Sequence, residues 1–440
     1  MKIAWFTPLS DKSAIGRASV LIVRELAKLA DVEVWHSESG PIHSVNSTTT
    51  FFRNAEDPIL ERLAKFDLIF YNFGNHLSFH RDIFLTASKY PGVAILHDFV
   101  MHHFFVSYYL EELRDPAQYL AEMERLYGTE GLALTQQSLL RERIWETDQV
   151  VEFPMFETAM RGALGVVTHS DFFLEKVSAL RTGPVCKIPL PYELPRSEIQ
   201  TKRESLGIPK DQLIVLTVGH ANPNKRLETT IKVIGSDSQL RSKLHFLIAG
   251  PCDPQYQKQL EAISKKYGMQ DCVQFLGYVS DEHLQLCLTH ADICVNLRYP
   301  AFEGASASVI EEMYYGKPVV VSDTGFYTEL PSDCVRKIRP HEEQLDLRAA
   351  LLDLLDSSHR TSLGQRAREF AAATFLAEQY AREVVRFAWD VRSARPIYSL
   401  ADRVASEFGR MGVASGMELP DTVSEACAEL FFKVKPVAGN

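Results

Sequence analysis

The stretch 296–330 constrains the fold of this chain more than any other. It follows the apolar run 291–297, whose composition is typical of a strand buried on both faces of a parallel sheet. A short loop and a helix come next, and Gly316 and Pro318 end that helix before a second apolar strand over 317–323. This order of strand, loop, helix and strand predicts an open α/β sheet, which binds ligands at the carboxyl ends of its strands.

Two carboxylates in this stretch are candidates for contacts with a sugar. We expect Glu303 to open the helix and Glu311 to follow a little over two helical turns later, so that both lie near one face. Carboxylates accept hydrogen bonds from the hydroxyl groups of a sugar or a ribose. Between them, the small residues Gly304, Ala305 and Ser306 leave backbone N–H groups free at a helix start, which suits an anionic phosphate.

The pattern resembles the signature of the retaining glycosyltransferases of family 4, which have the GT-B fold. There, two Glu residues separated by seven others precede a Gly-Lys-Pro segment; here these are Glu303, Glu311 and 316–318. Many bacterial relatives with the preceding Arg-x-Pro pattern, which contains Arg298 in this chain, have Gly-Glu where this chain has Glu303-Gly304. The resemblance implies that Glu303 orients the donor sugar and that Glu311 contacts its ribose.

Composition limits the class of protein. A chain of 440 residues is long enough for two domains with full cores, and its 46% hydrophobic and 24% charged residues are ordinary for a soluble globular protein. The formal net charge of −10 argues against a nucleic-acid partner. No apolar run approaches the length of a membrane span. The seven cysteines include no C-x-x-C pair, which favours reduced thiols in the cytoplasm over disulfides or a zinc site.

The first half of the chain alternates apolar strands with amphipathic helices. We predict a helix near 17–30 and a helical insertion over 99–162. The predicted strands cover 2–7, 32–36, 66–73, 92–98, 165–170 and 185–191. The loop before the first helix is similar to the first loop of the resembled family, which makes Gly16 a candidate donor contact; a plain strand–helix turn is the alternative.

Histidines gather near the end of the strand 92–98. His97 lies at the carboxyl end of that strand, where α/β sheets bind ligands. A His at this place in the resembled family contacts the donor sugar near the reacting carbon, which implies a catalytic role for His97. The nearby His76, His102 and His103 raise the alternative of a metal site, but adjacent residues of a helix point to different faces. We therefore expect a polar lining of the cleft and no metal.

The second half opens with a β-branched strand over 213–218. It ends at Gly219 and is followed by His220, Lys225 and Arg226 before a helix, an arrangement that suits a diphosphate. The resemblance implies that Lys225 grips the donor diphosphate and assists catalysis. His220 stands where the family has Arg, and Arg226 replaces a Gly and supplies further charge; a solvated Lys-Arg pair is the alternative.

The rest of the second half continues the alternation and ends in helices. The loop Tyr278, Val279 and Ser280 is similar to the family's nucleobase contact, which backbone groups usually make. A strand is predicted over 244–250, the segment 335–340 follows the signature stretch, and helices are predicted over 254–267, 341–356, 361–390, 401–412 and 422–434. In GT-B proteins the last long helix crosses back onto the first domain. The two terminal helices either dock there or face an oligomer partner or a membrane.

The resemblance implies an α/β chain with the GT-B fold, that is, two doubly wound Rossmann-like domains facing across a cleft, with the helical insertion in the first. It assigns 1–195 to the acceptor side, 213–375 to nucleotide-sugar binding and 376–440 to helices that cross back, with a linker near 196–212. Two such domains agree with the two series of alternating strands and helices.

The activity implied by the resemblance is that of a retaining, metal-independent hexosyltransferase. It would use a UDP-, GDP- or dTDP-sugar, require no cofactor, and act on a glycan, lipid-linked or small-molecule hydroxyl, as in polysaccharide biosynthesis. We expect a cytoplasmic protein; contact with the inner face of the membrane and the oligomeric state are left open. The alternative is a catalytically impaired GT-B protein that binds nucleotide or serves as a scaffold. An oxidoreductase is disfavoured because the chain lacks G-x-G-x-x-G.

Overall fold

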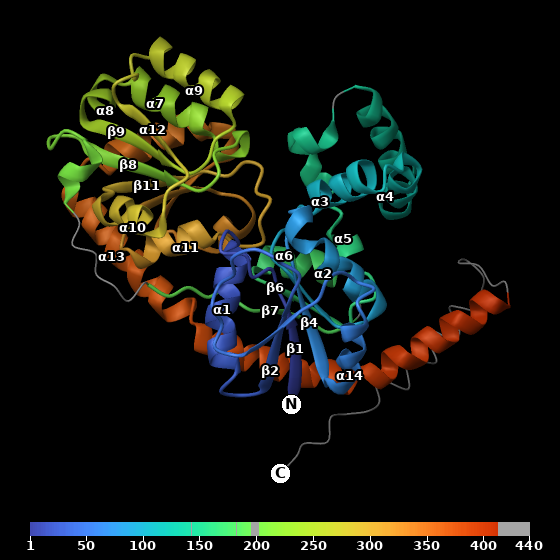
Figure 1. Ribbon diagram of the computed structural model, residues 1–440. Coiled ribbons are helices and arrows are strands. Elements are labelled where there is room, and N and C mark those ends of the chain that lie inside the picture. The colour runs from blue at the N-terminus through green and yellow to red at the C-terminus, as the bar shows by residue number, and fades with distance from the viewer. Residues whose placement is uncertain (142, 182, 195–201, 412–440) are drawn as a thin grey trace.

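The protein consists of two α/β domains, each built around one parallel sheet (Figure 1). The computed structural model describes residues 1–141, 143–181, 183–194 and 202–411. The first sheet has seven strands in the order β3-β2-β1-β4-β5-β6-β7, and the second has six in the order β10-β9-β8-β11-β12-β13. Helices flank both sheets, which confirms the predicted pair of doubly wound domains. The domain boundaries given above stay a prediction.

The first domain contains the predicted strands and one that was not predicted. Its strands are β1 (Lys2–Phe6), β2 (Asp31–His36), β3 (Thr48–Phe51), β4 (Leu68–Phe73), β5 (Val93–Leu96), β6 (Gly165–Thr168) and β7 (Val185–Lys187). Its helices are α1 (Ala14–Leu26), α2 (Leu77–Lys89), α3 (His102–Val106), α4 (Pro116–Leu140), α5 (Phe156–Ala159) and α6 (Asp171–Ser178). The edge strand β3 was not predicted because its sequence does not alternate between apolar and polar residues. Three of its four residues, which are threonine or phenylalanine, are exposed.

Two features of the first domain differ from or refine the prediction. Helix α1 begins at Ala14 rather than near 17, because the Ser13 side chain caps it by accepting a hydrogen bond from the backbone N–H of Gly16, 3.0 Å away. The insertion over 99–162 is helical, as predicted, and α3, α4 and α5 stand together beside the second domain in Figure 1. A π-helical segment, Ser107–Glu112, connects α3 to the rest of the insertion.

The second domain repeats the same alternation. Its strands are β8 (Leu213–Val218), β9 (Leu244–Ala249), β10 (Val273–Gly277), β11 (Ile293–Asn296), β12 (Val319–Ser322) and β13 (Val335–Ile338). Its helices are α7 (Leu227–Ser236), α8 (Ser238–Lys243), α9 (Pro254–Lys266), α10 (Asp281–His290), α11 (Ala307–Tyr314), α12 (Glu343–Asp353) and α13 (Ser357–Thr374). Short 3-10 helices occur in both domains. They cover Pro58–Lys65, Ile144–Glu146, Asp148–Glu152, Arg203–Leu206, Pro223–Lys225, Gly325–Glu329 and Pro340–Glu342.

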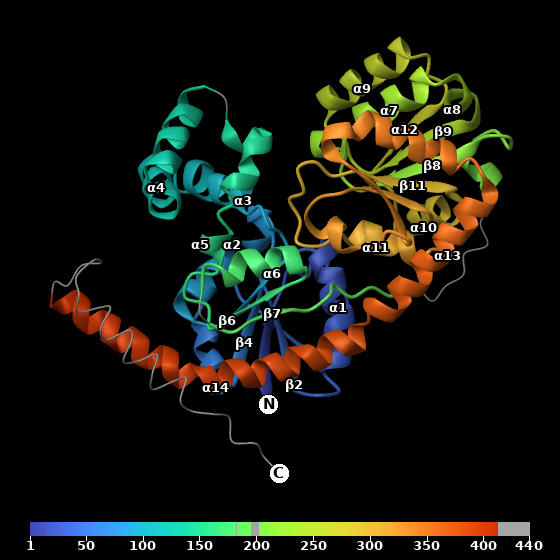
Figure 2. The same cartoon turned by 180° about the vertical axis from the view of Figure 1, so that it is seen from behind.

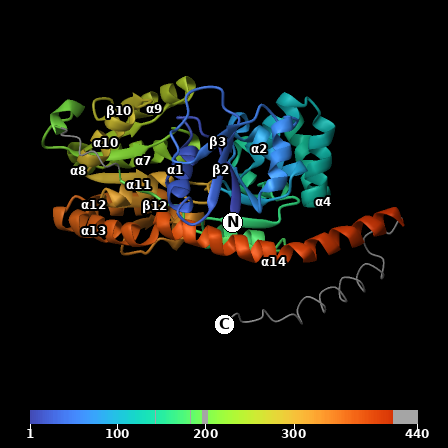
Figure 3. The same ribbon diagram turned by 60° about the horizontal axis from the view of Figure 1, so that its bottom comes forward.

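One long helix, α14 (Ala377–Arg410), returns from the second domain to the first. It runs from α13 along the base of the first domain past α1 and β2 (Figures 2 and 3). Its buried side chains Tyr380, Val384 and Phe387 share a core cluster with Ile3 and Trp5 of β1. This agrees with the prediction that the last long helix crosses back. Among the described residues, no helix combines the length and the apolar character needed to cross a membrane.

The structure corrects the predicted C-terminal helix boundaries. The single helix expected over 361–390 is two helices, because the chain breaks at Phe375, whose carbonyl accepts hydrogen bonds from the Tyr192 N–H at 3.0 Å and the Tyr314 hydroxyl at 3.2 Å. The helix expected over 401–412 is the end of α14. The helix expected over 422–434 lies outside the described residues.

Each sheet reverses its strand order at one position. The reversal lies between β1 and β4 in the first sheet and between β8 and β11 in the second. Open parallel sheets bind ligands beyond the carboxyl ends of strands at such a position. The loops after β8 and β11 carry most of the predicted site residues of the second domain, so the topology brings those residues together.

Candidate active site

The two domains meet through main-chain hydrogen bonds at the cleft. The backbone N–H of Gly304 donates to the carbonyl oxygen of His97, 2.8 Å away. The N–H groups of Phe99 and Val100 both donate to the carbonyl oxygen of Phe302, at 2.8 and 2.9 Å. The loop after β11 of the second domain is therefore joined to the loop after β5 of the first.

Glu303 lies outside helix α11, which corrects the expectation that it opens this helix. The helix begins at Ala307, and Ser306 is its N-cap, with its hydroxyl accepting from the N–H of Val309 at 3.4 Å. The backbone at Glu303 instead forms an antiparallel bridge with Asp98 of the first domain. Because Glu303 is in the loop, it does not share a helical face with Glu311.

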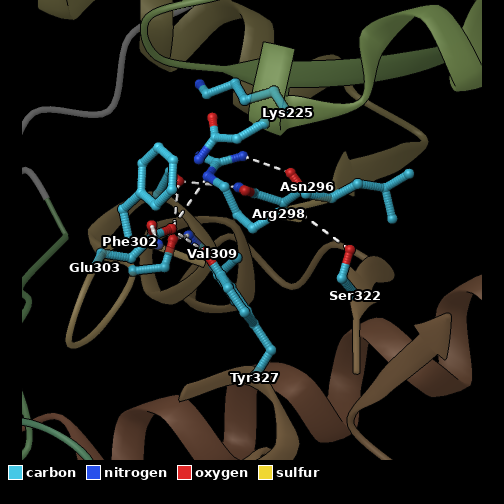
Figure 4. Close-up of polar contacts among 12 residues, drawn as sticks. Lys225, Asn296, Arg298, Phe302, Glu303, Val309, Ser322 and Tyr327 are labelled. Carbon is cyan, nitrogen blue, oxygen red and sulfur yellow. Dashed lines mark hydrogen bonds and ion pairs between the residues drawn. The ribbon is translucent and has the colours of Figure 1, made fainter. Parts of the chain in front are cut away.

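The carboxylate of Glu303 is held from three sides (Figure 4). Its Oε1 accepts a hydrogen bond from the Tyr327 hydroxyl and lies 3.1 Å from Nε of Arg298. Its Oε2 accepts from the N–H of Phe302 at 3.2 Å. The Arg298 side chain is 8% exposed and that of Glu303 is 18% exposed, so the ion pair is largely shielded from water. These contacts fix the orientation of the carboxylate.

The order Glu303-Gly304 has a packing reason. A Cβ atom added at Gly304 would lie 3.0 Å from Cδ1 of Phe173 and 3.1 Å from the carbonyl oxygen of His97. Any larger residue would therefore press on the first domain at the point where the two loops are hydrogen-bonded. Glycine is therefore the residue that fits at position 304 of this chain, and the carboxylate occupies the neighbouring position 303.

Lys225 is buried at the carboxyl end of β8, close to the Arg298 side chain (Figure 4). Its Nζ donates to the carbonyl oxygen of Val218. Burial, and then the charge of Arg298, holds the pKa of Lys225 well below its usual value, while Glu303 and Glu312 act in the opposite direction. Because Lys225 is buried, water screens its side chain poorly, so this residue would interact strongly with an anion bound beside it.

Gly219, at the end of β8, is required by both its backbone conformation and the space around it. Gly219 has a φ of +93°, and an added Cβ would lie 2.8 Å from Nζ of Lys225. The next residue, His220, is exposed, and its pKa is lowered by partial burial and by the charge of Lys225. The structure thus brings Gly219, His220 and Lys225 together as predicted from their spacing.

Arg226 does not offer a free charge, which corrects the expectation for this residue. Its Nε lies 2.9 and 3.1 Å from the two carboxylate oxygens of the buried Glu343, at the start of α12. Its φ of +55° lies in the left-handed region, which favours glycine over an arginine. The second buried cation beside Lys225 is Arg298 rather than Arg226.

Glu311 faces the segment that leads out of the first domain. Its Oε1 accepts a hydrogen bond from the Tyr192 hydroxyl at 2.6 Å. Burial raises its pKa, whereas the Tyr192 hydrogen bond and Arg17 lower it. Arg17 of α1 itself pairs with Asp281 of α10 at 2.7 Å, a second contact between the domains.

A further buried carboxylate, Glu312, was not predicted. It is 0% exposed, and its Oε1 accepts from Nδ2 of Asn296 at 3.0 Å. Its Oε2 has no hydrogen-bond partner among the described residues, and burial raises its pKa to about 8. The helical spacing could have indicated that Glu312 is buried, because it lies three residues after the buried Val309 and next to the buried Met313.

His97 contacts other polar groups of the first sheet. Its Nε2 lies 2.9 Å from Oδ1 of Asn72, and its Nδ1 lies 3.2 Å from Nε2 of His169 at the end of β6. Burial lowers the pKa of His97 well below its usual range and that of His169 to about 4. His169 was missed, although it ends a buried strand just as His97 does.

The other histidines of the predicted cluster lie apart from His97. His102 and His103 belong to the insertion, where they contact Tyr119 at 2.6 Å and the carbonyl of Trp145 at 2.8 Å. His76 precedes α2 and lies 2.9 Å from the Ser78 hydroxyl. Within the described ranges, no three His, Cys, Asp or Glu side chains are grouped as ligands of a metal ion.

The remaining candidates lie at the margins of this site. Tyr278 is exposed after β10, Val279 packs on the second core, and Ser280 caps α10 by accepting from the N–H of His283 at 3.2 Å. Gly16 is buried in α1, where an added Cβ would strike the carbonyl oxygen of Pro8. This close approach is sufficient to explain the glycine, so its role as a donor contact stays a prediction.

The second domain is similar in sequence to known glycosyltransferases. Residues 198–370 match the protein family described as glycosyl transferases group 1. A curated relative, D-inositol 3-phosphate glycosyltransferase 2 of Catenulispora acidiphila, is 29% identical over 199 residues, which are 41% of this chain and 46% of that protein. The match therefore spans less than half the length of the relative.

The whole chain is similar in structure to GT-B proteins. Sucrose-phosphate synthase of Thermosynechococcus elongatus has a TM-score of 0.62 and 17% identity, over 90% of this chain and all of that one. HepE of Anabaena, solved in complex with UDP and glucose, has a TM-score of 0.60 and 17% identity, over 88% of this chain and 98% of that one. These likenesses confirm the predicted GT-B fold.

Proposed function

We propose that this chain is a glycosyltransferase that moves a hexosyl unit from a nucleotide-diphosphate sugar to a hydroxyl acceptor, with retention of anomeric configuration. The observation that carries the proposal is the convergence of Lys225, Arg298 and Glu303 at the reversal point of the second sheet. All three lie inside the segment that matches group 1 glycosyl transferases.

Two buried cations and a helix start would hold the diphosphate. Lys225 and Arg298 are both buried, although Arg298 also pairs with Glu303, and α11 presents its N-terminus after Ser306. Preorganised charge of this kind stabilises the negative charge that develops on a leaving nucleotide. Because these groups can neutralise the diphosphate, the proposed reaction needs neither a metal nor another cofactor.

The environment of Glu303 supports retention without a carboxylate nucleophile. Both carboxylate oxygens are already bonded, to Tyr327, Arg298 and the N–H of Phe302. A carboxylate fixed in this way suits the orientation of sugar hydroxyls better than covalent attack. The acceptor hydroxyl would then attack from the face that the nucleotide leaves, while His97 contacts the sugar from the first domain.

The proposed donors are UDP-, GDP- and dTDP-sugars, with UDP tested first because HepE was solved with it. The proposed acceptors are a glycan, a lipid-linked oligosaccharide or a small molecule, in a role such as polysaccharide biosynthesis. A cytoplasmic location, with peripheral contact at the inner membrane face, belongs to the same proposal.

One observation favours a second candidate, a GT-B protein that binds nucleotide without transferring sugar. The N–H of Gly304 is used by His97, and Nζ of Lys225 is used by Val218. Both groups would have to leave their present partners to contact a donor. If they do not, the cleft would serve as a scaffold rather than as an active site.

A ligand screen followed by an activity assay tests both candidates. A nucleotide bound at 100 times its Kd should add about 2.7 kcal/mol to the free energy of unfolding, and so raise Tm. We expect this shift with one of UDP, GDP or dTDP, and release of that nucleotide from its sugar in the presence of acceptor glycans. Absence of any shift contradicts the proposal, and a shift without release under any acceptor supports the scaffold alternative.

A further inference from the structure

His97 and His169 form the middle of a buried hydrogen-bonded chain. At one end, Nδ1 of His169 lies 2.9 Å from the carbonyl oxygen of Ile188. At the other end, Nε2 of His97 lies 2.9 Å from Oδ1 of Asn72, and the two rings face each other at 3.2 Å in between. Asn72 is 0% exposed and His169 is 2% exposed, so water cannot readily substitute for a missing partner.

The two ends of this chain both accept hydrogen bonds. A carbonyl oxygen only accepts, so His169 must carry a proton on Nδ1. The Asn72 amide is oriented by its own Nδ2, which donates to the carbonyl oxygen of Phe6 at 2.9 Å, so its Oδ1 faces His97. Nε2 of His97 must therefore also carry a proton.

The contact between the rings then requires one proton more than two neutral imidazoles possess. With a proton on the outer nitrogen of each ring, the inner nitrogens would face each other with two lone pairs. If the His97 proton were on Nδ1 instead, the lone pair of Nε2 would face Oδ1 of Asn72. If the Asn72 amide were also turned over, its oxygen would face the carbonyl oxygen of Phe6. Three protons on two rings satisfy every contact, and the pair then carries one positive charge.

The surroundings oppose that charge. His80 lies on the same side, and its Nδ1 is 3.0 Å from the Asn72 carbonyl oxygen. The ring of Tyr380 from α14 is 6.0 Å from that of His169. Asp98 follows His97, but burial, together with the charge of Glu303, raises its pKa to about 7 despite the hydrogen bond from the Asn75 N–H. The Glu303 charge is balanced by Arg298. In the described part of the chain, no carboxylate is hydrogen-bonded to the pair.

We propose that His97 and His169 act as one proton-binding unit, which takes up a single proton from solvent when a nucleotide diphosphate binds in the cleft. The proton enters between Nδ1 of His97 and Nε2 of His169. The diphosphate supplies the negative charge that the pair lacks, and the completed chain locks the His97 ring. His169 is thus a positioning residue for His97, and this inference rests on the proposed function.

Calorimetry measures the proton directly. Binding of UDP, or of GDP or dTDP if one of those gives the Tm shift, is titrated at pH 7.5 in HEPES and in Tris, whose heats of ionisation differ. At this pH the terminal phosphate, with a pKa near about 6, is mostly ionised before it binds. We expect the wild-type protein to take up a measurable fraction of a proton for each nucleotide, and its affinity to fall by up to about tenfold for each unit of rising pH.

Two variants isolate the pair. His169→Gln has no titrating group but can still donate to Ile188, so it should bind the nucleotide with little proton uptake and a flat pH profile. His359→Gln removes an exposed histidine of α13, which pairs with Asp353 at 2.7 Å, and should behave as wild type. Equal proton uptake in the wild-type and His169→Gln proteins overturns the inference. If His169→Gln does not fold, a wild-type nucleotide affinity that does not change with pH overturns it.

The inference and the proposed function can fail separately. If a nucleotide binds without proton uptake, the inference fails and the function stands. If no nucleotide binds, the function fails, and ¹⁵N NMR of the histidine rings with pyrophosphate as the anion tests the pair alone. A coupled titration of His97 and His169 supports the pair, and two rings that stay neutral down to pH 5 overturn it.

Discussion

The N–H of Gly304 donates a hydrogen bond to the carbonyl oxygen of His97, 2.8 Å away, and so joins the second domain to the first beside the candidate active site. The neighbouring Phe302 carbonyl accepts two more hydrogen bonds from the loop after β5. These contacts set the distance between His97 and Glu303, the two residues proposed to act on the donor sugar from opposite sides. The contacts that join the two domains therefore also bring His97 and Glu303 to the same place.

Gly304→Ala should weaken these contacts. The added Cβ would lie 3.0 Å from the ring of Phe173. That ring is fully buried, with ring centroids of Phe99 at 5.4 Å and Phe156 at 5.1 Å, so it has little room to yield. Overpacking of this kind costs about 1–3 kcal/mol. We expect a lower Tm and a larger radius of gyration in small-angle X-ray scattering.

Gly40→Ala is the matched control, because an added Cβ there meets nothing within 4 Å. It should leave both measurements unchanged. If Gly304→Ala also leaves the radius of gyration and Tm at their wild-type values, the two loops are not what holds the domains together.

Lys225→Ala should weaken nucleotide binding by about 1–3 kcal/mol, the scale of a lost charge-assisted hydrogen bond. The effect should be large for a lysine because Lys225 is buried, so its charge is poorly screened by water. Calorimetric Kd values for the nucleotide give the change. Lys232→Ala, which removes a partly exposed lysine paired with Glu228 at 3.2 Å, is the control and should bind as wild type. Equal affinity in the two variants would remove Lys225 from the site.

Glu312 predicts a dependence of stability on pH. Its pKa is raised to about 8 in the folded protein by burial, from an ordinary value near 4.5 when unfolded. Between these values the folded state binds a proton that the unfolded state does not, so the free energy of unfolding falls as pH rises through this window. Glu312→Gln imitates the protonated side chain, so this loss should be smaller in the variant.

The comparison is made by urea unfolding at pH 5 and pH 8. Relative to wild type, Glu312→Gln should gain about 1–3 kcal/mol at pH 8, the scale of an unsatisfied buried polar group, and gain little at pH 5. Glu124→Gln, an exposed residue of α4, should change neither value. An equal effect of Glu312→Gln at both pH values would mean that Glu312 is already neutral, or that Lys225 and Arg298 keep it charged throughout.

The sequence was sufficient to predict most of the fold because both sheets are parallel. Parallel strands are apolar along their whole length, so β1, β4, β8 and β12 stand out from the helices around them. Where this signal is weak, prediction failed. The edge strand β3 is short and polar, and the break between α13 and α14 depends on hydrogen bonds from Tyr192 and Tyr314, which are distant in sequence.

The sequence predicted where several candidate residues lie, but not their detailed geometry. The spacing and the family resemblance placed Lys225 after Gly219 and Glu303 at the start of a helix, and the structure brings both residues to the carboxyl edge of the second sheet. The helix start was misplaced because the bridge between Asp98 and Glu303 extends the loop, and this bridge depends on the other domain. The partners His169 and Tyr327 were missed because their roles follow from tertiary contacts rather than from local patterns.

The two carboxylates of the signature should differ in kinetic effect. Glu311 is held by Tyr192 on the second turn of α11, and its proposed contact with the ribose is similar in the ground and transition states. Glu311→Gln should therefore mainly raise KM for the donor. Glu303 is proposed to contact the sugar itself, so Glu303→Gln should lower kcat by about 10- to 100-fold with a smaller change in KM. Wild-type kcat in Glu303→Gln would make this residue a structural one.

Tyr327→Phe tests whether the orientation of Glu303, rather than its charge alone, matters for the reaction. The Tyr327 hydroxyl donates to Oε1 of Glu303 and also contacts the Ser306 side chain, and the tyrosine ring is fully buried, so the substitution removes these hydroxyl contacts and keeps the packing of the ring. Arg298 still balances the charge of the carboxylate, at 3.1 Å from the same oxygen.

We expect Tyr327→Phe to lower kcat by about 5- to 30-fold, the scale of a lost hydrogen bond to a charged group, with little change in KM. Steady-state kinetics with the identified donor gives both constants, and Tyr267→Phe, at the end of α9, is the control. A Tyr327→Phe enzyme that loses affinity for the donor while keeping its kcat would show that Tyr327 supports binding and does not position Glu303.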